Sequence, residues 1–315
     1  MGYFLGIDIG GTLIKAGLSR ANGEEIAVAE CDGETVSPQP GFSEREMEPL
    51  WRDLCQTIRQ VLNLADITGD RVRGVSFSSH GKGLYAIDKK GQPVRNGIVS
   101  SDTRAGAMVV ELQQQGIEAV TYPRSLQPIW NSHPAVLLRW LKQHEPAQYE
   151  AIDRVLMAHD YLRFRLTGEA TAEITNISGS NLFNQQTADY DPVLMAAFGI
   201  EEVADKTAPL LGSAELAGQV TSTAAAQCGL PAGTAVDGGL LPGGVIAWRA
   251  ATLFTKAAQP RRAIWPGSYG SFATTIISVM RSSTVGYKNA ASSRATSHSC
   301  RTCSAPTSVA ICRAG

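Results

Sequence analysis

Short apolar runs open the chain, and each ends at residues that favour a turn. The segment YFLGIDIG is rich in β-forming residues and leads into Gly10-Gly11-Thr12. A second run, LIKAGLS, stops before Asn22-Gly23, a strong hairpin dipeptide, and EIAVAEC follows it. The pattern predicts an antiparallel meander of three strands at the N-terminus.

The spacing of apolar residues then becomes helical, which predicts a helix from Glu46 to Leu64. One face of this helix collects its apolar side chains: Leu50, Leu54, Ile58, Val61 and Leu62. Further helices are predicted over 104–115, 134–143, 146–153 and 158–167. The last of them should end at Thr167-Gly168, a plausible C-cap.

Strand signals return at RVRGVSFSS and at GLYAIDKKGQPV, the second with a Lys-Gly turn. Further along, shortly before residue 240, PAGTAV is typical of a loop that enters a strand, which should continue into DGGLL. Strands combined with helices in this order indicate an α/β fold. The 315 residues are enough to bury a sizeable core.

Composition separates the chain into two parts near residue 240. All 29 acidic residues lie between Asp8 and Asp237, whereas residues 241–315 carry nine Lys and Arg and no acidic residue. Residues 254–315 contain no leucine, and 15 of the last 35 residues are Ser, Thr or Cys. Natural domain junctions usually lie in polar linkers, but this change falls inside a predicted strand. We therefore predict a domain over 1–240 and an irregular, disordered tail over 241–315.

Composition also excludes several classes of protein. Hydrophobic residues make up 43% and charged residues 18% of the chain, as in soluble globular proteins. No apolar run approaches the roughly 18 residues that a membrane span needs, and the start MGYFLGIDIGG lacks the basic flank of a signal peptide. Six cysteines are too sparse for a disulfide framework. We expect a cytoplasmic protein without membrane contacts.

The first candidate site lies in the turn after the first strand: Asp8, Gly10, Gly11 and Thr12, with Lys15 on the next strand. Glycines at a strand end let backbone N–H groups approach phosphate oxygens, and a threonine hydroxyl adds a donor. A carboxylate at this point can hold Mg²⁺ through water beside the phosphates of a nucleotide. An ordinary Gly-Gly hairpin is the alternative, and no Walker motif follows.

Three later segments carry further polar side chains: Ser79-His80-Gly81-Lys82-Gly83, Ser100-Ser101-Asp102-Thr103-Arg104 and Ala158-His159-Asp160-Tyr161-Leu162. In the first, His80 and Lys82 offer donors to hydroxyl groups, although a solvated glycine-rich loop is the alternative. In the second, Asp102 and Arg104 suit a polyol because each can make paired hydrogen bonds, and an N-cap at Ser101 or Asp102 competes. In the third, Asp160 is also a first-turn acid favoured by the helix dipole.

In this order and spacing, the segments resemble the FGGY family of carbohydrate kinases, whose lobes have the actin-like, ribonuclease H-like fold. The resemblance covers residues 3–240 and includes HDYLRFRLTGE and TAEITNISGSNLFNQQTADYD. Within the family, SPQPGFSEREMEPLW and SHGKGLYAID are most similar to the L-xylulose kinases. A glucokinase-like group also begins D-I-G-G-T, but its cysteine-rich zinc motif is absent from the middle of this chain.

The resemblance implies a role for each candidate residue. The phosphates of ATP and Mg²⁺ would face Asp8, Gly10, Gly11, Thr12 and Lys15, with Asp8 reaching the metal through water. The sugar pocket would be lined by His80, Gly81 and Lys82, with Asp102, Arg104 and Asp160 close by. The implied reaction moves the γ-phosphoryl group of ATP to a terminal hydroxyl of a ketopentose or related sugar, with a carboxylate as base.

The chain departs from the family where the catalytic base is expected. The family has a pattern such as G-T-P-V-V-G-G-L-F-D, and the corresponding run GTAVDGGLLP ends at Pro242, which cannot accept a proton. Asp237 precedes the glycines, so we do not assign it this role. Because the composition changes at the same place, we hypothesise a shifted reading frame after about residue 240 and a truncated, inactive kinase. Translating the other two frames downstream tests this hypothesis.

The alternative function is a non-catalytic sugar-binding or regulatory protein derived from one kinase lobe, which would require the tail to fold. A zinc set from His298, Cys300, Cys303 and Cys312 lacks a proper ligand spacing. The basic residues of the tail are dispersed and do not predict nucleic-acid binding. The expected partner is a small-molecule sugar, and the sequence does not indicate an oligomeric state.

Overall fold

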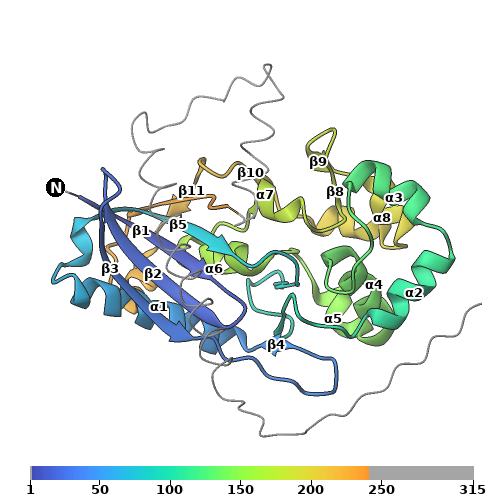
Figure 1. Ribbon diagram of the computed structural model, residues 1–315, viewed down its shortest axis with the longest axis horizontal. Helices are drawn as coiled ribbons and strands as arrows, with labels where there is room; N and C mark the ends of the chain where they lie inside the picture. Colours follow the sequence, from blue (N-terminus) through green and yellow to red (C-terminus); the bar gives the residue numbers. More distant parts are fainter. Residues whose placement is uncertain (1, 241–315) are drawn as a thin grey trace, which may run out of the picture. The chain divides into compact units, whose positions relative to one another are not determined.

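A six-stranded sheet with the strand order β11-β12-β5-β1-β2-β3 organises residues 2–240, the part of the chain that the computed structural model describes (Figure 1). Its strands are Tyr3–Ile9 (β1), Leu13–Arg20 (β2), Glu25–Asp32 (β3), Val72–Ser79 (β5), Leu216–Gln219 (β11) and Ala235–Asp237 (β12). β1, β2 and β3 form the predicted antiparallel meander. β5 runs parallel to β1, and β12 runs parallel to β5.

The first hairpin dipeptide acts as the sequence predicts. Gly23 adopts a left-handed φ of 84°, and its N–H donates to the carbonyl of Arg20 across 2.9 Å. A residue with a side chain would be strained in this conformation, so Asn22-Gly23 fixes the β2–β3 turn.

One long helix, Met47–Leu64 (α1), packs against β2 and β3. All five apolar residues that the sequence placed on its inner face are buried, so the predicted face is confirmed. Two more helices border the same core, Ala158–Thr167 (α6) beside β5 and Ser222–Cys228 (α9) beside α1. Gly168 follows α6 and donates to the carbonyl of Phe164 across 2.7 Å, as its predicted C-cap should.

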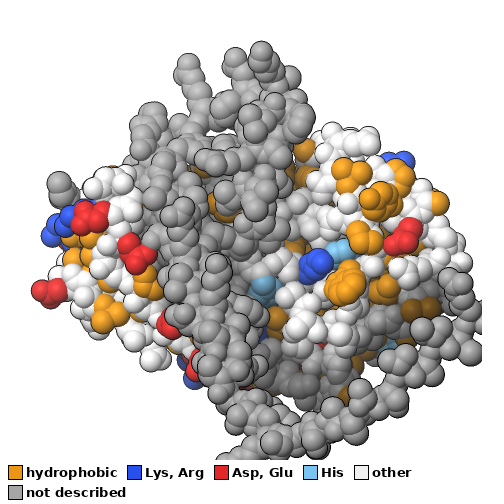
Figure 2. Space-filling view, viewed as in Figure 1, with side chains coloured by type: hydrophobic (Ala, Val, Ile, Leu, Met, Phe, Trp, Pro, Cys, Tyr) orange, Lys and Arg blue, Asp and Glu red, His pale blue; other side chains and the backbone are white. Residues whose placement is uncertain are grey.

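A second hydrophobic core lies among four other helices: Gly106–Gln114 (α2), Pro134–His144 (α4), Pro146–Ala151 (α5) and Pro192–Ala197 (α8). Another helix, Glu118–Ser125 (α3), packs against α8. Tyr190 packs against both cores. Apolar side chains also gather on the face that carries α3 (Figure 2), where Val120, Tyr122 and Leu126 are exposed.

Short elements complete the described residues: Glu44–Arg45 (β4), Gly97–Ile98 (β6), Ala172–Glu173 (β7), Phe183–Asn184 (β8), Asp189–Tyr190 (β9), Leu210–Leu211 (β10), Ile174–Ile177 (α7), and the 3₁₀ turns Gly69–Arg71 and Glu201–Lys206. The short strands among them pair in three two-stranded sheets: β4 with β6, β7 with β10, and β8 with β9.

One predicted strand is wrong, and another ends earlier than predicted. Over residues 83–94 the chain makes only isolated bridges, because Leu84 pairs with Ile98 while Ile87 pairs with Pro93 and Arg154, so no continuous ladder forms. The last predicted strand does form, as β12, but it ends at Asp237, the first residue of DGGLL, and Gly239 takes a left-handed φ of 77°.

Helix prediction was better, but it missed α3, α7, α8 and α9, and α2 begins at Gly106 rather than at residue 104. The N-cap of α2 is therefore Ala105, and the predicted cap at Ser101 or Asp102 is wrong. No helix within residues 2–240 is long and apolar enough to cross a membrane. The predicted tail over 241–315 lies outside the described residues.

Candidate functional site

Three neighbouring strands end at the same edge of the sheet. β1, β5 and β12 are mutually parallel, so their carboxyl ends coincide. The N–H of His80, just after β5, donates to the carbonyl of Ile9 in β1 across 2.9 Å. The N–H of Leu240, just after β12, donates to the carbonyl of Phe77 in β5 across 2.8 Å. The fold thus brings together the turn after β1, the loop after β5 and the Gly238-Gly239 pair.

The residues predicted to bind phosphate lie on one hairpin, residues 8–15, which we call the phosphate hairpin. Asp8 and Lys15 are direct cross-strand partners in β1 and β2. The Asp8 Oδ1 accepts a hydrogen bond from Ser78 Oγ at 2.9 Å. Burial raises the pKa of Asp8, and the Ser78 hydrogen bond and the Lys15 charge only partly oppose it. The Lys15 ammonium lies 3.4 Å from Glu30 Oε2.

The turn of the phosphate hairpin is small and accessible. Gly10 N–H donates to the carbonyl of Leu13 across 2.8 Å, which closes the turn. A Cβ built on Gly11 would meet no atom within 4 Å, and Thr12 is exposed. Backbone N–H groups at such a turn can therefore be approached by a phosphate group.

The same turn fits Mg²⁺ bound beside phosphates. Within residues 2–240 no three or more His, Cys, Asp or Glu side chains are grouped to hold a metal by themselves. Mg²⁺ in phosphoryl-transfer sites keeps several waters and needs only one or two carboxylates in addition to phosphate oxygens. The partly exposed Asp8, with one oxygen engaged by Ser78, is a suitable single carboxylate.

The sugar loop, residues 79–83, follows β5 directly. His80 Nε2 lies 3.4 Å from the hydroxyl of Tyr85, and burial, followed by the positive charge of Arg45, lowers the pKa of His80 to about 4. Its imidazole is therefore neutral at pH 7 and can accept or donate a hydrogen bond. Lys82 has a φ of 69°, a left-handed conformation that is strained for lysine, and its Nζ lies 5.5 Å from the ring centroid of Trp130.

A second segment, Trp130 to His133, borders the sugar loop. Gly83 N–H donates to the carbonyl of Ser132 across 2.8 Å. The His133 Nδ1 lies 2.7 Å from Asn181 Nδ2, and burial with the nearby Lys82 charge lowers the pKa of His133 to about 3. Trp130 itself is 53% exposed.

Asp102 and Arg104 lie inside the protein and bind each other. Arg104 Nη2 is 2.8 Å from Asp102 Oδ2 and 2.7 Å from Glu44 Oε1, and both members of the predicted pair have fully buried side chains. The guanidinium also lies 4.0 Å from the ring centroid of Phe42. The link to the sugar loop is indirect, since Asn131 Nδ2 donates to the backbone carbonyl of Asp102 across 2.6 Å. Contact of this pair with a sugar stays a prediction.

Asp160 is also fully buried, at the start of α6. Its Oδ1 lies 3.0 Å from Arg163 Nη2 and 3.2 Å from His159 Nε2, and its Oδ2 accepts from the N–H of Met157 at 3.2 Å. The Oδ1 also accepts from the N–H of Glu173 at 3.0 Å. This arrangement favours the alternative of a structural acid in the first helical turn, and direct sugar contact stays a prediction.

Buried side chains connect Asp160 to the sugar loop and to the glycine pair. His159 Nδ1 lies 3.1 Å from Ser79 Oγ. Arg163 Nη1 donates to the carbonyl of Gly238 across 2.6 Å. Asp237, the residue before this glycine, accepts from the N–H of Gly239 at 3.0 Å, and burial raises the pKa of Asp237 to about 7. The expected base position, Pro242, lies outside the described residues.

Sequence reasoning missed five residues that the structure places at or behind the site: Glu44, Arg45, Ser78, Trp130 and Arg163. Apart from the Asp160–Arg163 pair, their partners are distant in sequence, so spacing alone could not reveal them. One weak signal was present for Arg163, a cation three residues after Asp160 on a predicted helix.

Comparison with known proteins agrees with this arrangement. Residues 3–243 match the model of the FGGY family of carbohydrate kinases, N-terminal domain. The chain is 43% identical over 240 residues to the probable L-xylulose kinase of Pasteurella multocida, covering 76% of this chain and 50% of that protein. It is 45% identical over 238 residues to the L-xylulose/3-keto-L-gulonate kinase of Escherichia coli, covering 76% and 48%.

Solved structures show the same fold. The xylulose kinase from Rhodospirillum rubrum superposes with a TM-score of 0.70 at 27% identity, over 76% of this chain and 49% of that one. Plasmodium falciparum glycerol kinase, solved with ADP, gives a TM-score of 0.70 at 18% identity, over 76% and 48%. The chain thus spans about half the length of the relatives it matches, and the expected actin-like architecture is confirmed for that half. By its sequence and by its fold, the chain belongs to the FGGY family of carbohydrate kinases.

Proposed function

We propose that residues 1–240 form the sugar- and phosphate-binding half of an ATP-dependent sugar kinase of the L-xylulose type. The observation that carries this proposal is the adjacency of the phosphate hairpin and the sugar loop. They lie on parallel neighbours, joined by the Ser78–Asp8 hydrogen bond of 2.9 Å and the His80–Ile9 hydrogen bond of 2.9 Å. A phosphoryl donor and a hydroxyl acceptor bound to these two loops would be close enough to react.

On the phosphate side, backbone N–H groups near Gly11 and the Thr12 hydroxyl would donate to phosphate oxygens. Asp8 would hold Mg²⁺ through water, and the metal would neutralise charge on the phosphates of ATP when bound. Lys15 lies beside Asp8 but is also close to Glu30, so we propose that it tunes the carboxylate more than it contacts phosphate.

On the sugar side, the neutral His80 and the Lys82 ammonium would hydrogen-bond hydroxyl groups of the ketose, and the backbone of Gly81 leaves room for them. Trp130 offers an apolar face to the carbon skeleton. The buried pair Asp102–Arg104 and Asp160 would fix the wall of this pocket from behind. The relatives are named for L-xylulose and 3-keto-L-gulonate, and we propose a ketopentose or a related keto sugar as the ligand of this chain.

We further propose that the 315-residue chain binds sugar without phosphorylating it. Our prediction from the sequence places Pro242, which cannot accept a proton, at the family's base position. The family match ends at residue 243. The split at residue 240 and the cytoplasmic location stay predictions.

Isothermal titration with L-xylulose, D-xylulose and 3-keto-L-gulonate, together with an assay for ADP release, tests the proposal. We expect saturable binding of one keto sugar, an affinity at least tenfold lower in His80→Ala, and no sugar-dependent ADP. His144→Ala, which removes an exposed histidine stacked on Trp140, is the matched control and should bind normally. Absence of binding to all three sugars would contradict the sugar site, and sugar-dependent ADP would contradict the loss of activity.

A further inference from the structure

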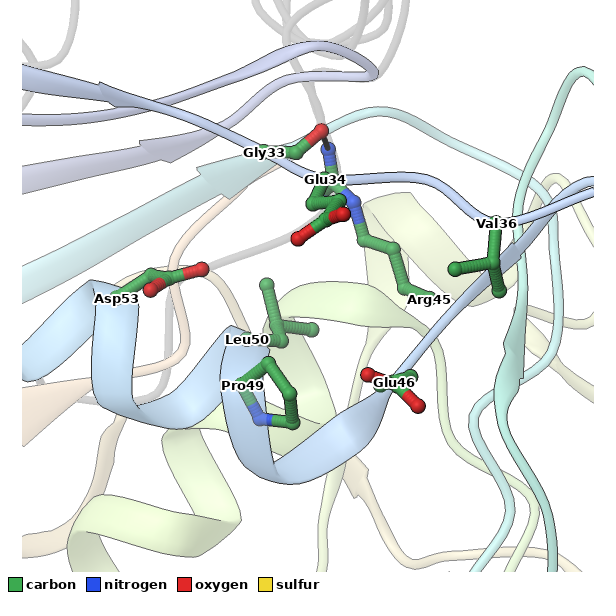
Figure 3. Close-up of a pocket in the computed structure, with 8 residues that line it drawn as sticks. All are labelled: Gly33, Glu34, Val36, Arg45, Glu46, Pro49, Leu50 and Asp53. Carbon is green, nitrogen blue, oxygen red and sulfur yellow. Dashed lines mark hydrogen bonds between the residues drawn. The ribbon is translucent and has the colours of Figure 1, made fainter.

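Arg45 reaches from β4 to the turn of the phosphate hairpin. Its Nη2 donates to the carbonyl of Gly11 across 2.9 Å. The same nitrogen lies 3.5 Å from the carbonyl of Gly33, a contact drawn in Figure 3. Gly33 N–H in turn donates to the carbonyl of Thr12 across 2.7 Å. The hairpin turn is therefore fastened from behind, by a side chain that precedes α1 and by the segment that follows β3.

Among the described residues, no carboxylate forms a salt bridge with Arg45. Arg45 is 1% exposed, makes no ion pair within residues 2–240, and its Nε and Nη1 are buried without hydrogen-bond partners. Arg95, Arg104 and Arg163, by contrast, all pair with carboxylates. The cavity beside Arg45 measures about 10 Å³, enough for about one water, and is lined by Glu34, Glu46 and Asp53 among others (Figure 3).

Leaving a guanidinium buried and unpaired is costly, and apolar replacements of buried charges are often neutral or stabilising. Stability therefore does not explain an arginine at this position. Gly33 also indicates that the position of the Arg45 guanidinium matters. Any side chain at residue 33 would collide with it, because a Cβ there would lie 2.3 Å from Arg45 Nη2. The chain leaves the space that the guanidinium needs to reach Gly11.

The geometry of the peptide group says what this contact does. In a trans peptide the C=O and the following N–H point in opposite directions, and the described residues contain no cis peptide. When Arg45 holds the Gly11 carbonyl on the inner side of the turn, the N–H of Thr12 points away from Arg45, toward the accessible side. A positive charge that forms no salt bridge within residues 2–240 lies directly behind that donor, which favours an anion in front of it.

We propose that Arg45 is a positioning residue for the phosphate group: it orients the Thr12 N–H through the Gly11 carbonyl and adds a positive charge behind the turn. The proposal rests on the proposed function of the hairpin, and its ligand class is the terminal phosphates of a polyphosphate chain. It gives Arg45 no contact with the sugar.

Inorganic tripolyphosphate with Mg²⁺ is a suitable probe for the 315-residue chain, because it needs only the phosphate side of the site. We expect Arg45→Met to melt at the wild-type temperature or higher and to bind tripolyphosphate at least tenfold more weakly. Arg45→Lys, which keeps the charge without the planar fork, should be intermediate, and Gly33→Ala should weaken binding by displacing the guanidinium. Arg20→Gln, at an exposed pair with Glu24, controls for net charge and should change binding less than twofold.

Amide hydrogen exchange tests whether Arg45 fixes the turn independently of whether the hairpin binds phosphate. The Gly33 N–H, bonded to Thr12, should exchange at least tenfold faster in Arg45→Met than in the wild type, whether or not tripolyphosphate binds. If the wild type binds no tripolyphosphate, the proposed function of the hairpin fails while the exchange result still decides whether Arg45 fixes the turn. Unchanged exchange together with unchanged tripolyphosphate affinity in Arg45→Met would overturn the role of Arg45. A loss of stability in Arg45→Met with normal affinity in Arg45→Lys and Gly33→Ala would identify a merely structural residue.

Discussion

Arg163 Nη1 donates to the carbonyl oxygen of Gly238 across 2.6 Å, while Nη2 of the same guanidinium lies 3.0 Å from Asp160 Oδ1. Both charged side chains are fully buried. The pair joins the first turn of α6 to the glycines after β12, and His159 extends the connection to Ser79 at the end of β5. The buried Asp160–Arg163 ion pair therefore lies between the sugar loop, which begins at Ser79, and Gly238, which is more than 150 residues later in the chain.

Replacing Asp160 by asparagine should destabilise the protein strongly. The substitution keeps the shape of the side chain but leaves the buried Arg163 guanidinium without a counter-charge, which costs about 3 kcal/mol or more. Urea denaturation of Asp160→Asn measures the loss. The control is Asp153→Asn, because Asp153 pairs with Arg154 at the surface and should contribute under about 1 kcal/mol. Equal effects of the two substitutions would contradict the importance of the buried pair.

Local spacing predicted the N-terminal meander and the apolar face of α1 correctly. These elements depend on residues three or four apart, or on turn dipeptides such as Asn22-Gly23. The strand predicted over 83–94 did not form because the backbone there bonds to several separate parts of the chain, at Ser132, at Ile98 and at 153–156. A local pattern cannot reveal such partners. Long-range pairing decides such segments.

The candidate site shows the same division. The residues of the phosphate hairpin could be predicted because a short motif places Asp8 and Gly11 within one turn. The burial of Asp102, Arg104 and Asp160 could not, because it depends on partners such as Glu44 and Arg163 that approach from other elements. A charged residue near a predicted pocket can face the ligand or support the wall, and only tertiary contacts distinguish these roles.

Gly239→Ala should be among the most damaging single-methyl additions in the described chain. The new Cβ would lie 2.5 Å from the carbonyl oxygen of Phe77, and the φ of 77° disfavours any side chain. We expect a loss of about 3 kcal/mol, against roughly 1 kcal/mol for the strain alone. Chemical denaturation of Gly239→Ala, and of a variant that adds backbone strain alone, measures the two losses in the free energy of unfolding.

Gly233→Ala is the matched control for that substitution. Gly233 has a φ of 88°, but a Cβ there would meet no atom within 4 Å, so only backbone strain is added. The difference between the two variants measures the close approach of the glycine pair to β5. If both lose the same free energy of unfolding, the contact with Phe77 does not constrain the turn.

Lys82 should reverse the usual order of alanine and glycine. Its φ of 69° is strained for any residue with a Cβ, so Lys82→Gly should be more stable than Lys82→Ala by roughly 1 kcal/mol. At the exposed Lys89, which has no left-handed φ, alanine should be at least as stable as glycine. Both Lys82 variants should bind the sugar about tenfold more weakly, because both remove the ammonium. Normal sugar affinity in Lys82→Gly would show that the strained lysine does not contact the ligand.

His133 should make the stability of the protein depend on pH below neutrality. Burial, with a smaller effect of Lys82, lowers the pKa of His133 from about 6.5 to about 3 in the folded state. Between these values the unfolded chain binds the extra proton, so the free energy of unfolding falls as pH falls, by up to roughly 1.4 kcal/mol per pH unit. His133→Gln removes this contribution.

The comparison must be between variant and wild type, because other groups titrate in the same range. Asp8, Glu173 and Asp237 have raised pKa values and stabilise the folded state as pH falls, which opposes the effect of His133. Their contributions cancel in the difference between the two proteins. Urea midpoints measured from pH 7.5 to 4.5 should therefore show His133→Gln gaining stability relative to the wild type as the pH is lowered. A difference that stays constant over this range would mean that the His133 imidazole is protonated equally in the folded and unfolded states.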